Sequence, residues 1–263
     1  MSLELKNNDR RAFLKNIGLL ATGAVVATGV GSLINPQTAS AAAPALPWPY
    51  ATLDTAVIRR RAYDNYWIGG CMYASAKALL DTLYDTAGSP WDTMPGDMFK
   101  YGKGGVFNWG TLCGALNGSL YVMNLATGTS VDQLGNELMG WYTTNPFPSA
   151  LMDSYARFRG VRQTVADSPL CHLSVTKWCE ETNFKINSDE KKDRCAKLAA
   201  DTAAKAAELM NAWKAGAFKG VYQPNAEFAS CLSCHNGVAS QLDNEQGLAN
   251  CTECHNDTHV HHM

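Results

Sequence analysis

Two Cys-x-x-Cys-His motifs lie near the C-terminal end of the chain, at residues 231–235 and 251–255. Two thiols at this spacing can add across the two vinyl groups of one haem, and the adjacent histidine then lies under the iron. Four-cysteine zinc sites and thiol redox pairs also use Cys-x-x-Cys spacing, but neither needs a histidine directly after each second cysteine. The motifs therefore predict two haem c groups per chain. The expected thioether anchors are Cys231, Cys234, Cys251 and Cys254, and the expected proximal iron ligands are His235 and His255.

The connection between the two motifs limits how this part of the chain can fold. Only the 15 residues 236–250 separate them, and these residues are polar and rich in turn formers. So short a segment has no room for a folded layer between two macrocycles. We therefore expect residues 222–263 to form a small, loop-rich di-haem module, whose core is supplied largely by the closely spaced haems.

The remaining histidines are candidates for the sixth iron ligand, which decides between electron transfer and small-ligand chemistry. Apart from His172, they lie in the C-terminal tail and are His259, His261 and His262. His259 follows the proximal His255 by only four residues, too short a segment to pass around a macrocycle. We expect His259 and His261 to ligate the other haem or a haem of a partner subunit, with His262 as an alternative. His172, beside Cys171, is interpreted as an ordinary helix residue.

The first 41 residues have the features of an export signal. Arg10 and Arg11 precede Phe-Leu-Lys, a modestly apolar stretch spans residues 17–34, and small residues at 39–41 resemble a cleavage site. An uncleaved membrane anchor is the alternative, but the low hydrophobicity of the stretch and the cleavage site favour removal. We expect twin-arginine export to the periplasm and no membrane attachment after cleavage.

The composition of the chain excludes several protein classes. It is 46% hydrophobic and 17% charged with a net charge of −2, which excludes a disordered chain and gives no basic surface for nucleic acid. Little of the sequence alternates with period two. Helical spacing recurs instead, most clearly in a helix that begins near Ser188 and carries an apolar stripe through Cys195 and Trp213. Residues 42–221 are therefore predicted to form an all-α domain. Further helices are expected at residues 112–125, 131–142 and 149–159.

The helical domain carries the remaining five cysteines, which are Cys71, Cys113, Cys171, Cys179 and Cys195. Disulfides are one interpretation, although five thiols cannot all pair within one chain. Buried free thiols are another, and these suit Cys113 and Cys195 on packed helix faces. The third is an iron–sulfur cluster held by four of the five thiolates. Export of a folded protein favours the cluster, because clusters are normally built inside the cell.

Several segments resemble the helical family named for its C…GCAxxG…C…C pattern. They are residues 70–74, 112–118, 171–173 and 194–198. Followed by two haem motifs and a histidine tail, this region is similar to the split-Soret cytochrome c family, although the G-C-A core here reads Cys113-Gly114-Ala115 and Cys179 is additional. The resemblance implies a homodimer with four haems at one end, stacked within each subunit. It also implies sixth ligands supplied across the subunit interface and an iron–sulfur centre in the helical part.

These features predict a periplasmic di-haem carrier that passes electrons between redox partner proteins without transforming a substrate. The alternative is a haem-dependent reductase of a small nitrogen oxide, oxyanion or peroxide. No constellation of Lys, Arg or Tyr in the haem module supports substrate activation, which disfavours the reductase. A third interpretation is a structural or sensory dimer in which the haems mainly hold the fold together.

Overall fold

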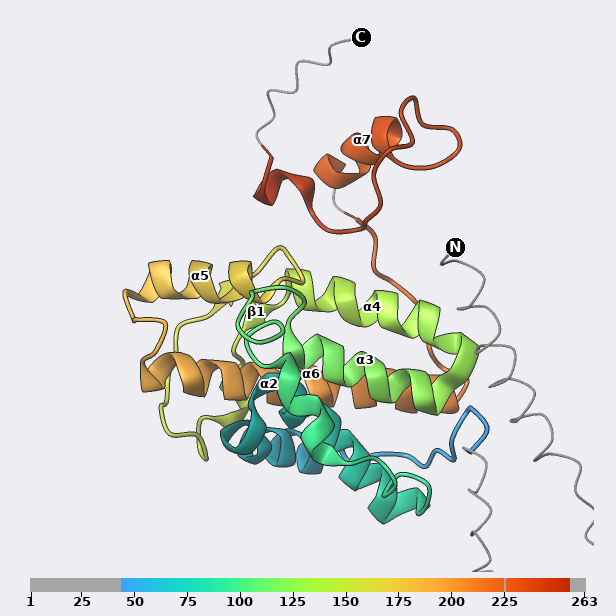
Figure 1. Ribbon diagram of the computed structural model, residues 1–263, viewed down its shortest axis with the longest axis vertical. Coiled ribbons are helices and arrows are strands. Elements are labelled where there is room, and N and C mark those ends of the chain that lie inside the picture. The colour runs from blue at the N-terminus through green and yellow to red at the C-terminus, as the bar shows by residue number, and fades with distance from the viewer. Residues whose placement is uncertain (1–43, 225, 256–263) are drawn as a thin grey trace, which may run out of the picture. The chain divides into compact units, whose positions relative to one another are not determined.

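The computed structural model describes residues 44–224 and 226–255. Within these ranges the body of the chain is built from α2 (Thr55–Ala87), α3 (Gly114–Thr127), α4 (Val131–Thr144), α5 (Cys171–Thr182) and α6 (Asp189–Lys214), as Figure 1 shows. The predicted all-α class is confirmed. A search of the described helices finds none that could span a bilayer. The predicted signal peptide, residues 1–41, lies outside the described residues.

Helix α6 forms the centre of the body and packs along α2. Ser188 caps its N-terminus, where the Ser188 hydroxyl accepts a hydrogen bond from the Lys191 amide at 3.1 Å. Alanine combines the best helix propensity with a small side chain, so an alanine-rich face allows neighbouring helices to approach closely. The fully buried alanines of α6 are Ala196, Ala199, Ala200, Ala203, Ala204, Ala206 and Ala207.

Helix α3 approaches the backbone of α2 through two glycines one turn apart. A Cβ at Gly118 would lie 2.5 Å from the Met72 carbonyl oxygen, and one at Gly114 would lie 2.8 Å from the Met72 amide nitrogen. Both distances are shorter than any side chain tolerates, and a backbone atom cannot rotate away. The contact therefore requires glycine at both positions. It also places Cys113, the residue before α3, next to Cys71 of α2.

Helix α2 is interrupted just before Cys71. Gly70 has φ 79° and ψ −171°, a left-handed backbone conformation that glycine adopts without steric cost. The interruption divides α2 into two helical segments, and Cys71 begins the second. The interruption at Gly70 therefore determines where the Cys71 thiol lies in the core.

Between α4 and α5 the chain forms a loop with little regular structure. It contains β1 (Pro146–Phe147), η3 (Ala150–Met152) and β2 (Thr164–Val165), and the two short strands pair antiparallel with Pro146 opposite Val165. The helix predicted over residues 149–159 is wrong beyond η3. A distant side chain binds an amide that such a helix would use, because Tyr63 accepts from Arg157 at 2.8 Å, and Asp201 holds the start of the segment by accepting from the Ser149 amide at 2.9 Å.

The described C-terminal residues contain two short helical elements. Helix α7 (Ala226–His235) carries the first Cys-x-x-Cys-His motif, and η4 (Cys251–Glu253) begins the second. The two elements contact each other, and the chain between them has no regular structure. Upstream, the backbone amides of Val221 and Tyr222 both donate to Glu137 at 2.8 Å, which fastens the start of this segment to α4. The remaining short helices of the described chain are η1 (Gly96–Gly102) and η2 (Gly128–Ser130).

Candidate metal and haem sites

Four of the five cysteines of the helical body lie together in its interior. The buried cysteine cluster consists of Cys71, Cys113, Cys171 and Cys195. Their thiols are close enough to interact electrostatically with one another, and each residue is only 3% to 9% exposed. Each comes from a different place in the fold: α2, the start of α3, the start of α5, and α6. The fifth, Cys179 on α5, is partly exposed, and Cys195 is the cysteine that acts most strongly on it.

Backbone pairing brings two of these thiols together. The Cys113 amide donates to the Pro169 carbonyl at 2.9 Å, and the Cys171 amide donates to the Thr111 carbonyl at 2.7 Å. Leu112 and Leu170 form the isolated β-bridge between these hydrogen bonds. The segment before α3 is therefore fastened to the segment before α5, so both helices start with a cysteine directed at the same interior region.

Two thiols of the buried cysteine cluster share a hydrogen bond. The Cys71 thiol donates to Cys195, and this bond, with Arg194 and Lys191, lowers the pKa of Cys195 despite burial. The same bond and burial raise the pKa of Cys71. Burial also raises the pKa of Cys113 and of Cys171. Thiolate, the form of cysteine that binds metals, is thus favoured at Cys195 first.

A buried polar chain accompanies these thiols. The Arg194 guanidinium donates to the Ser174 hydroxyl at 2.9 Å, and the Tyr142 hydroxyl donates to the same Ser174 oxygen at 3.2 Å. Tyr142 also hydrogen-bonds with the Cys113 thiol, and burial raises its pKa. Sequence reasoning missed this set, although a charged residue on the buried face of an alanine-rich helix was a signal for Arg194.

The buried cysteine cluster brings four potential metal-binding thiols close together. Among them, no three His, Cys, Asp or Glu side chains are already placed around one point to hold a metal ion. Soft thiolates are the donors that iron–sulfur clusters use, so the residue types fit such a centre.

The predicted haem-binding residues lie on α7 and η4. Cys231 and Cys234 are one turn apart on α7 and partly exposed, whereas Cys254 and His255 are exposed. The thiols of Cys231 and Cys251, one from each motif, are hydrogen-bonded to each other. The two attachment sites are therefore adjacent. The tail histidines His259, His261 and His262 lie outside the described residues.

The first predicted proximal histidine, His235, is oriented by a nearby side chain. His235 Nδ1 lies 3.0 Å from Asn244 Oδ1, and the Asn244 amide donates to the His235 carbonyl at 3.0 Å. Iron-binding histidines generally direct one ring nitrogen at such a partner, which fixes the ring orientation. Because Nδ1 is engaged by Asn244, iron would bind this ring through Nε2.

An ion pair links the second motif to the helix that carries Cys171. Lys177 of α5 lies 2.7 Å from Glu253, between the two cysteines of that motif, and 2.8 Å from Asp167. Partial burial acts to lower the pKa of Lys177, but its hydrogen bonds to these two carboxylates raise the pKa overall. His172, also on α5, is exposed, as expected for an ordinary helix residue.

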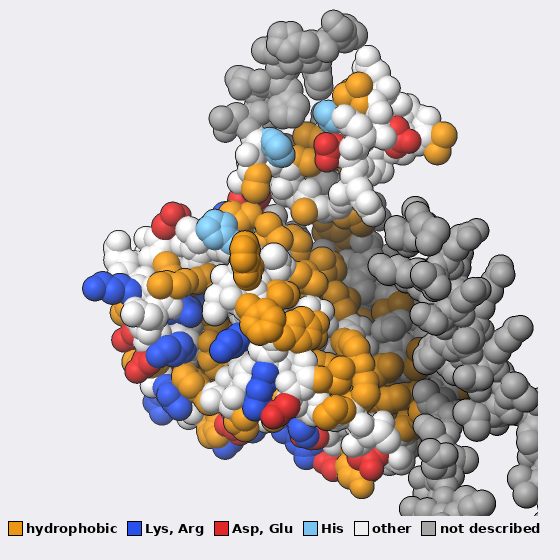
Figure 2. All heavy atoms as spheres, viewed as in Figure 1, with side chains coloured by type: hydrophobic (Ala, Val, Ile, Leu, Met, Phe, Trp, Pro, Cys, Tyr) orange, Lys and Arg blue, Asp and Glu red, His pale blue; other side chains and the backbone are white. Residues whose placement is uncertain are grey.

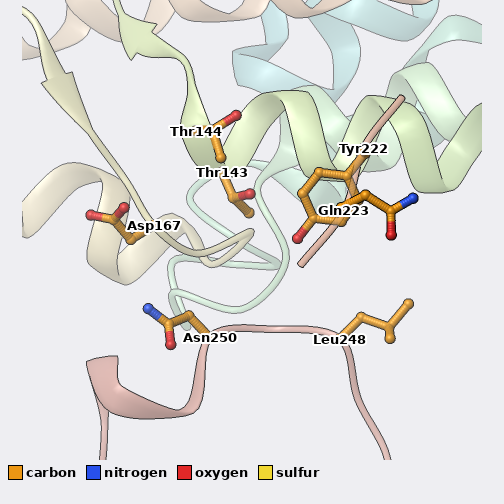
Figure 3. Close-up of a pocket in the computed structure, with 7 residues that line it drawn as sticks. All are labelled: Thr143, Thr144, Asp167, Tyr222, Gln223, Leu248 and Asn250. Carbon is orange, nitrogen blue, oxygen red and sulfur yellow. The ribbon is translucent and has the colours of Figure 1, made fainter. Parts of the chain in front are cut away.

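The surface adds two further features. Hydrophobic side chains gather on the face shown in Figure 2 over the region of α3, and Phe107 and Trp109 in the preceding loop are 64% and 82% exposed. A pocket shown in Figure 3 contains none of the predicted site residues. Its lining residues are Thr143, Thr144, Asp167, Tyr222, Gln223, Leu248 and Asn250.

Comparisons with known proteins show which family the chain belongs to. Residues 73–209 match the model of a family described as redox-active protein (C_GCAxxG_C_C). Split-Soret cytochrome c of Desulfovibrio desulfuricans is 32% identical over 271 residues, which cover 96% of each chain. The structure reported as a novel iron centre in the split-Soret cytochrome c from Desulfovibrio desulfuricans is 33% identical, with a TM-score of 0.75 over 81% of this chain and 91% of that chain. The resemblance predicted from the motifs is confirmed, and the chain belongs to the split-Soret cytochrome c family.

Proposed function

We propose that this protein is a periplasmic di-haem c-type cytochrome that transfers electrons between redox partner proteins. The family relationship supports a haem-type electron-transfer protein. The observation that carries the finer proposal is the presence of two complete Cys-x-x-Cys-His motifs whose thiols Cys231 and Cys251 are in contact. Two haems anchored this close together would exchange electrons rapidly.

The residues of both motifs fit covalent haem. Cys231, Cys234 and Cys251 are partly exposed and Cys254 is exposed, so all four thiols are accessible to a vinyl group. His235 is held by Asn244 in the orientation that Nε2 ligation needs. When bound, each haem iron supplies one-electron exchange between its ferric and ferrous states. The chain supplies the anchors, the proximal ligands and the hydrogen bond that sets the basicity of His235.

For the sixth ligands we propose His259 and His261. Both follow the second motif too closely to reach around its own macrocycle, so they would ligate the other haem or a haem of a second subunit. Ligation of the second kind requires a homodimer. With both iron positions filled by histidine, the haems would be low-spin and closed to small ligands, which is the state suited to electron transfer.

The buried cysteine cluster is the proposed site of one iron–sulfur centre. Its four thiols are buried and adjacent, whereas Cys179 is partly exposed. We therefore assign Cys71, Cys113, Cys171 and Cys195 as ligands and Cys179 as the remaining free thiol. A preassembled centre also gives a reason for twin-arginine export, which carries folded proteins.

Quantitative spectroscopy of the purified holoprotein tests these assignments. Pyridine haemochrome analysis should give two haems per chain, and a Cys231→Ala/Cys234→Ala variant should give one. Both haems should be low-spin with no spectral change on adding carbon monoxide, and His259→Ala or His261→Ala should create a high-spin, carbon monoxide-binding fraction. His172→Ala is the matched control and should leave the spectrum unchanged. A wild-type protein that binds carbon monoxide would instead favour the reductase.

The cluster and the assembly need separate measurements. Iron in excess of the haem iron, together with acid-labile sulfide, is expected in anaerobically purified protein. The content of non-haem iron and sulfide should decrease in the Cys71→Ser variant but persist in Cys179→Ser. Sedimentation analysis should give a dimer. A monomer with intact low-spin haems would refute ligation across subunits while leaving the carrier function standing.

A further inference from the structure

Arg194 is a buried cation at the edge of the buried cysteine cluster. Its residue is 1% exposed, and it lies on α6 directly before Cys195. A guanidinium cannot lose its proton inside a protein, so its charge is permanent. Removing such a charge from water costs several kcal/mol unless an anion lies close by. The position therefore requires a negative partner.

The described residues contain no carboxylate within ion-pair distance of Arg194. The other fully buried cation of α6, Lys197, is by contrast paired with Asp153 at 2.6 Å and Asp193 at 3.6 Å. The two side chains are three residues apart on one helix, and only Lys197 is neutralised by acidic residues.

Arg194 faces thiols and hydroxyls instead. Its Nη1 lies 4.0 Å from the Cys195 sulfur, its Nη2 donates to Ser174, and its Nε has no hydrogen-bond partner within the described chain. The groups that act most strongly on its charge are Cys195, Tyr142 and Cys113, and its charge also acts on Cys171. Cys195, where thiolate is favoured, can supply one negative charge, and a metal centre held by all four thiolates would place a larger negative charge beside Arg194.

We propose that Arg194 is the counter-charge that retains an anionic, thiolate-bound metal centre in the buried cysteine cluster and raises its reduction potential. The proposal rests on the iron–sulfur site assigned above and adds a residue outside the ligand set. Reduction adds one electron from an external donor to the centre, breaks no bond, and increases its negative charge by one. A fixed positive charge in a water-poor interior stabilises that reduced state more than the oxidised state.

Charge-changing variants of the holoprotein test the role of Arg194. The midpoint potential of the non-haem centre would be measured by redox titration followed by electron paramagnetic resonance, with dithionite as reductant. Arg194→Met should lower the potential by at least the equivalent of a tenfold change in the redox equilibrium, or about 59 mV for one electron. Arg194→Lys keeps the charge and should stay close to wild type. The haem potentials serve as an internal reference and should not change.

Lys192→Met is the matched control. It removes the same charge from the same helix two residues away, but Lys192 is 43% exposed and paired with Asp189, so water screens it. Its potential should equal that of wild type. Iron and sulfide analysis gives a second measurement: loss of the centre in Arg194→Met with retention in Arg194→Lys would also support the charge role.

Three results would overturn the proposal. If Arg194→Met keeps its full content of iron and sulfide and has the wild-type potential, the charge of Arg194 has no effect on the centre and the residue serves only in packing. Loss of the centre in both variants would show that guanidinium shape matters and charge does not. Absence of non-haem iron and sulfide from the wild-type protein would refute the iron–sulfur site itself. Because this result needs no variant, it is distinguishable from a failure of the Arg194 proposal.

Discussion

The close approach of α3 to α2 predicts that Gly118→Ala destabilises the protein, against the intrinsic preference of a helix for alanine. Helix propensity alone would stabilise the variant by about 1 kcal/mol. The added Cβ, however, would lie 2.5 Å from the Met72 carbonyl oxygen and 3.0 Å from the Ala76 amide nitrogen. Overpacking against backbone costs about 3 kcal/mol, at the upper end of the usual range. The net loss is therefore about 2 kcal/mol, which corresponds to a fall in Tm of roughly 4–8 °C.

Gly135→Ala provides the matched control. Gly135 is also a buried helix residue, but a Cβ there would meet only the tip of the flexible Leu120 side chain, at 3.1 Å. That variant should melt at or above the wild-type temperature. The assay is thermal unfolding followed by far-ultraviolet circular dichroism at one scan rate, with non-haem iron measured in parallel, because a displaced α3 also moves Cys113. A Gly118→Ala protein as stable as Gly135→Ala would refute the packing argument.

Three further predictions concern polar contacts. Asn244→Leu should raise the potential of one haem and leave the other unchanged in spectroelectrochemical titration, because the variant removes the acceptor at Nδ1 of His235. Lys177→Met should accelerate limited proteolysis of the C-terminal segment at low salt, and high salt should shrink the difference from wild type. Lys197→Met should lower the unfolding free energy by about 3–5 kcal/mol in denaturant titrations. Although burial alone would raise it, the pKa of Asp153 is lowered by the Lys197 hydrogen bond. The stabilisation it gives is therefore present above its ordinary pKa and is lost as the pH falls through the lowered value, a dependence that Lys197→Met should weaken.

The helices that sequence reasoning located well carry their own local signals. Ser188 and the acidic residues after it mark the start of α6, and Ser188 caps that helix in the structure. The stripe through Cys195 follows the buried face. Such signals depend on neighbours within a few residues, so they can be recognised without knowledge of the fold.

The helix predicted at residues 149–159 failed because its alternatives are distant in sequence. Tyr63 and Asp201 accept hydrogen bonds from backbone amides of that segment, and no local sequence pattern predicts partners so distant in the sequence. The same limit applies to the buried cysteine cluster. Spacing offered five candidate cysteines, and only the packing of separate helices distinguishes Cys179 from the other four. Arg194 and Asn244 were missed for the same reason.

The origin of the four clustered thiols has a consequence for the timing of maturation. Because α2, α3, α5 and α6 each provide one sulfur, no contiguous stretch of the nascent chain holds a complete ligand set. A centre bound there can be completed only after nearly the whole body has folded, and its presence then records that folding is finished. Under the twin-arginine export proposed above, the loaded centre would mark a folded chain as ready for transport.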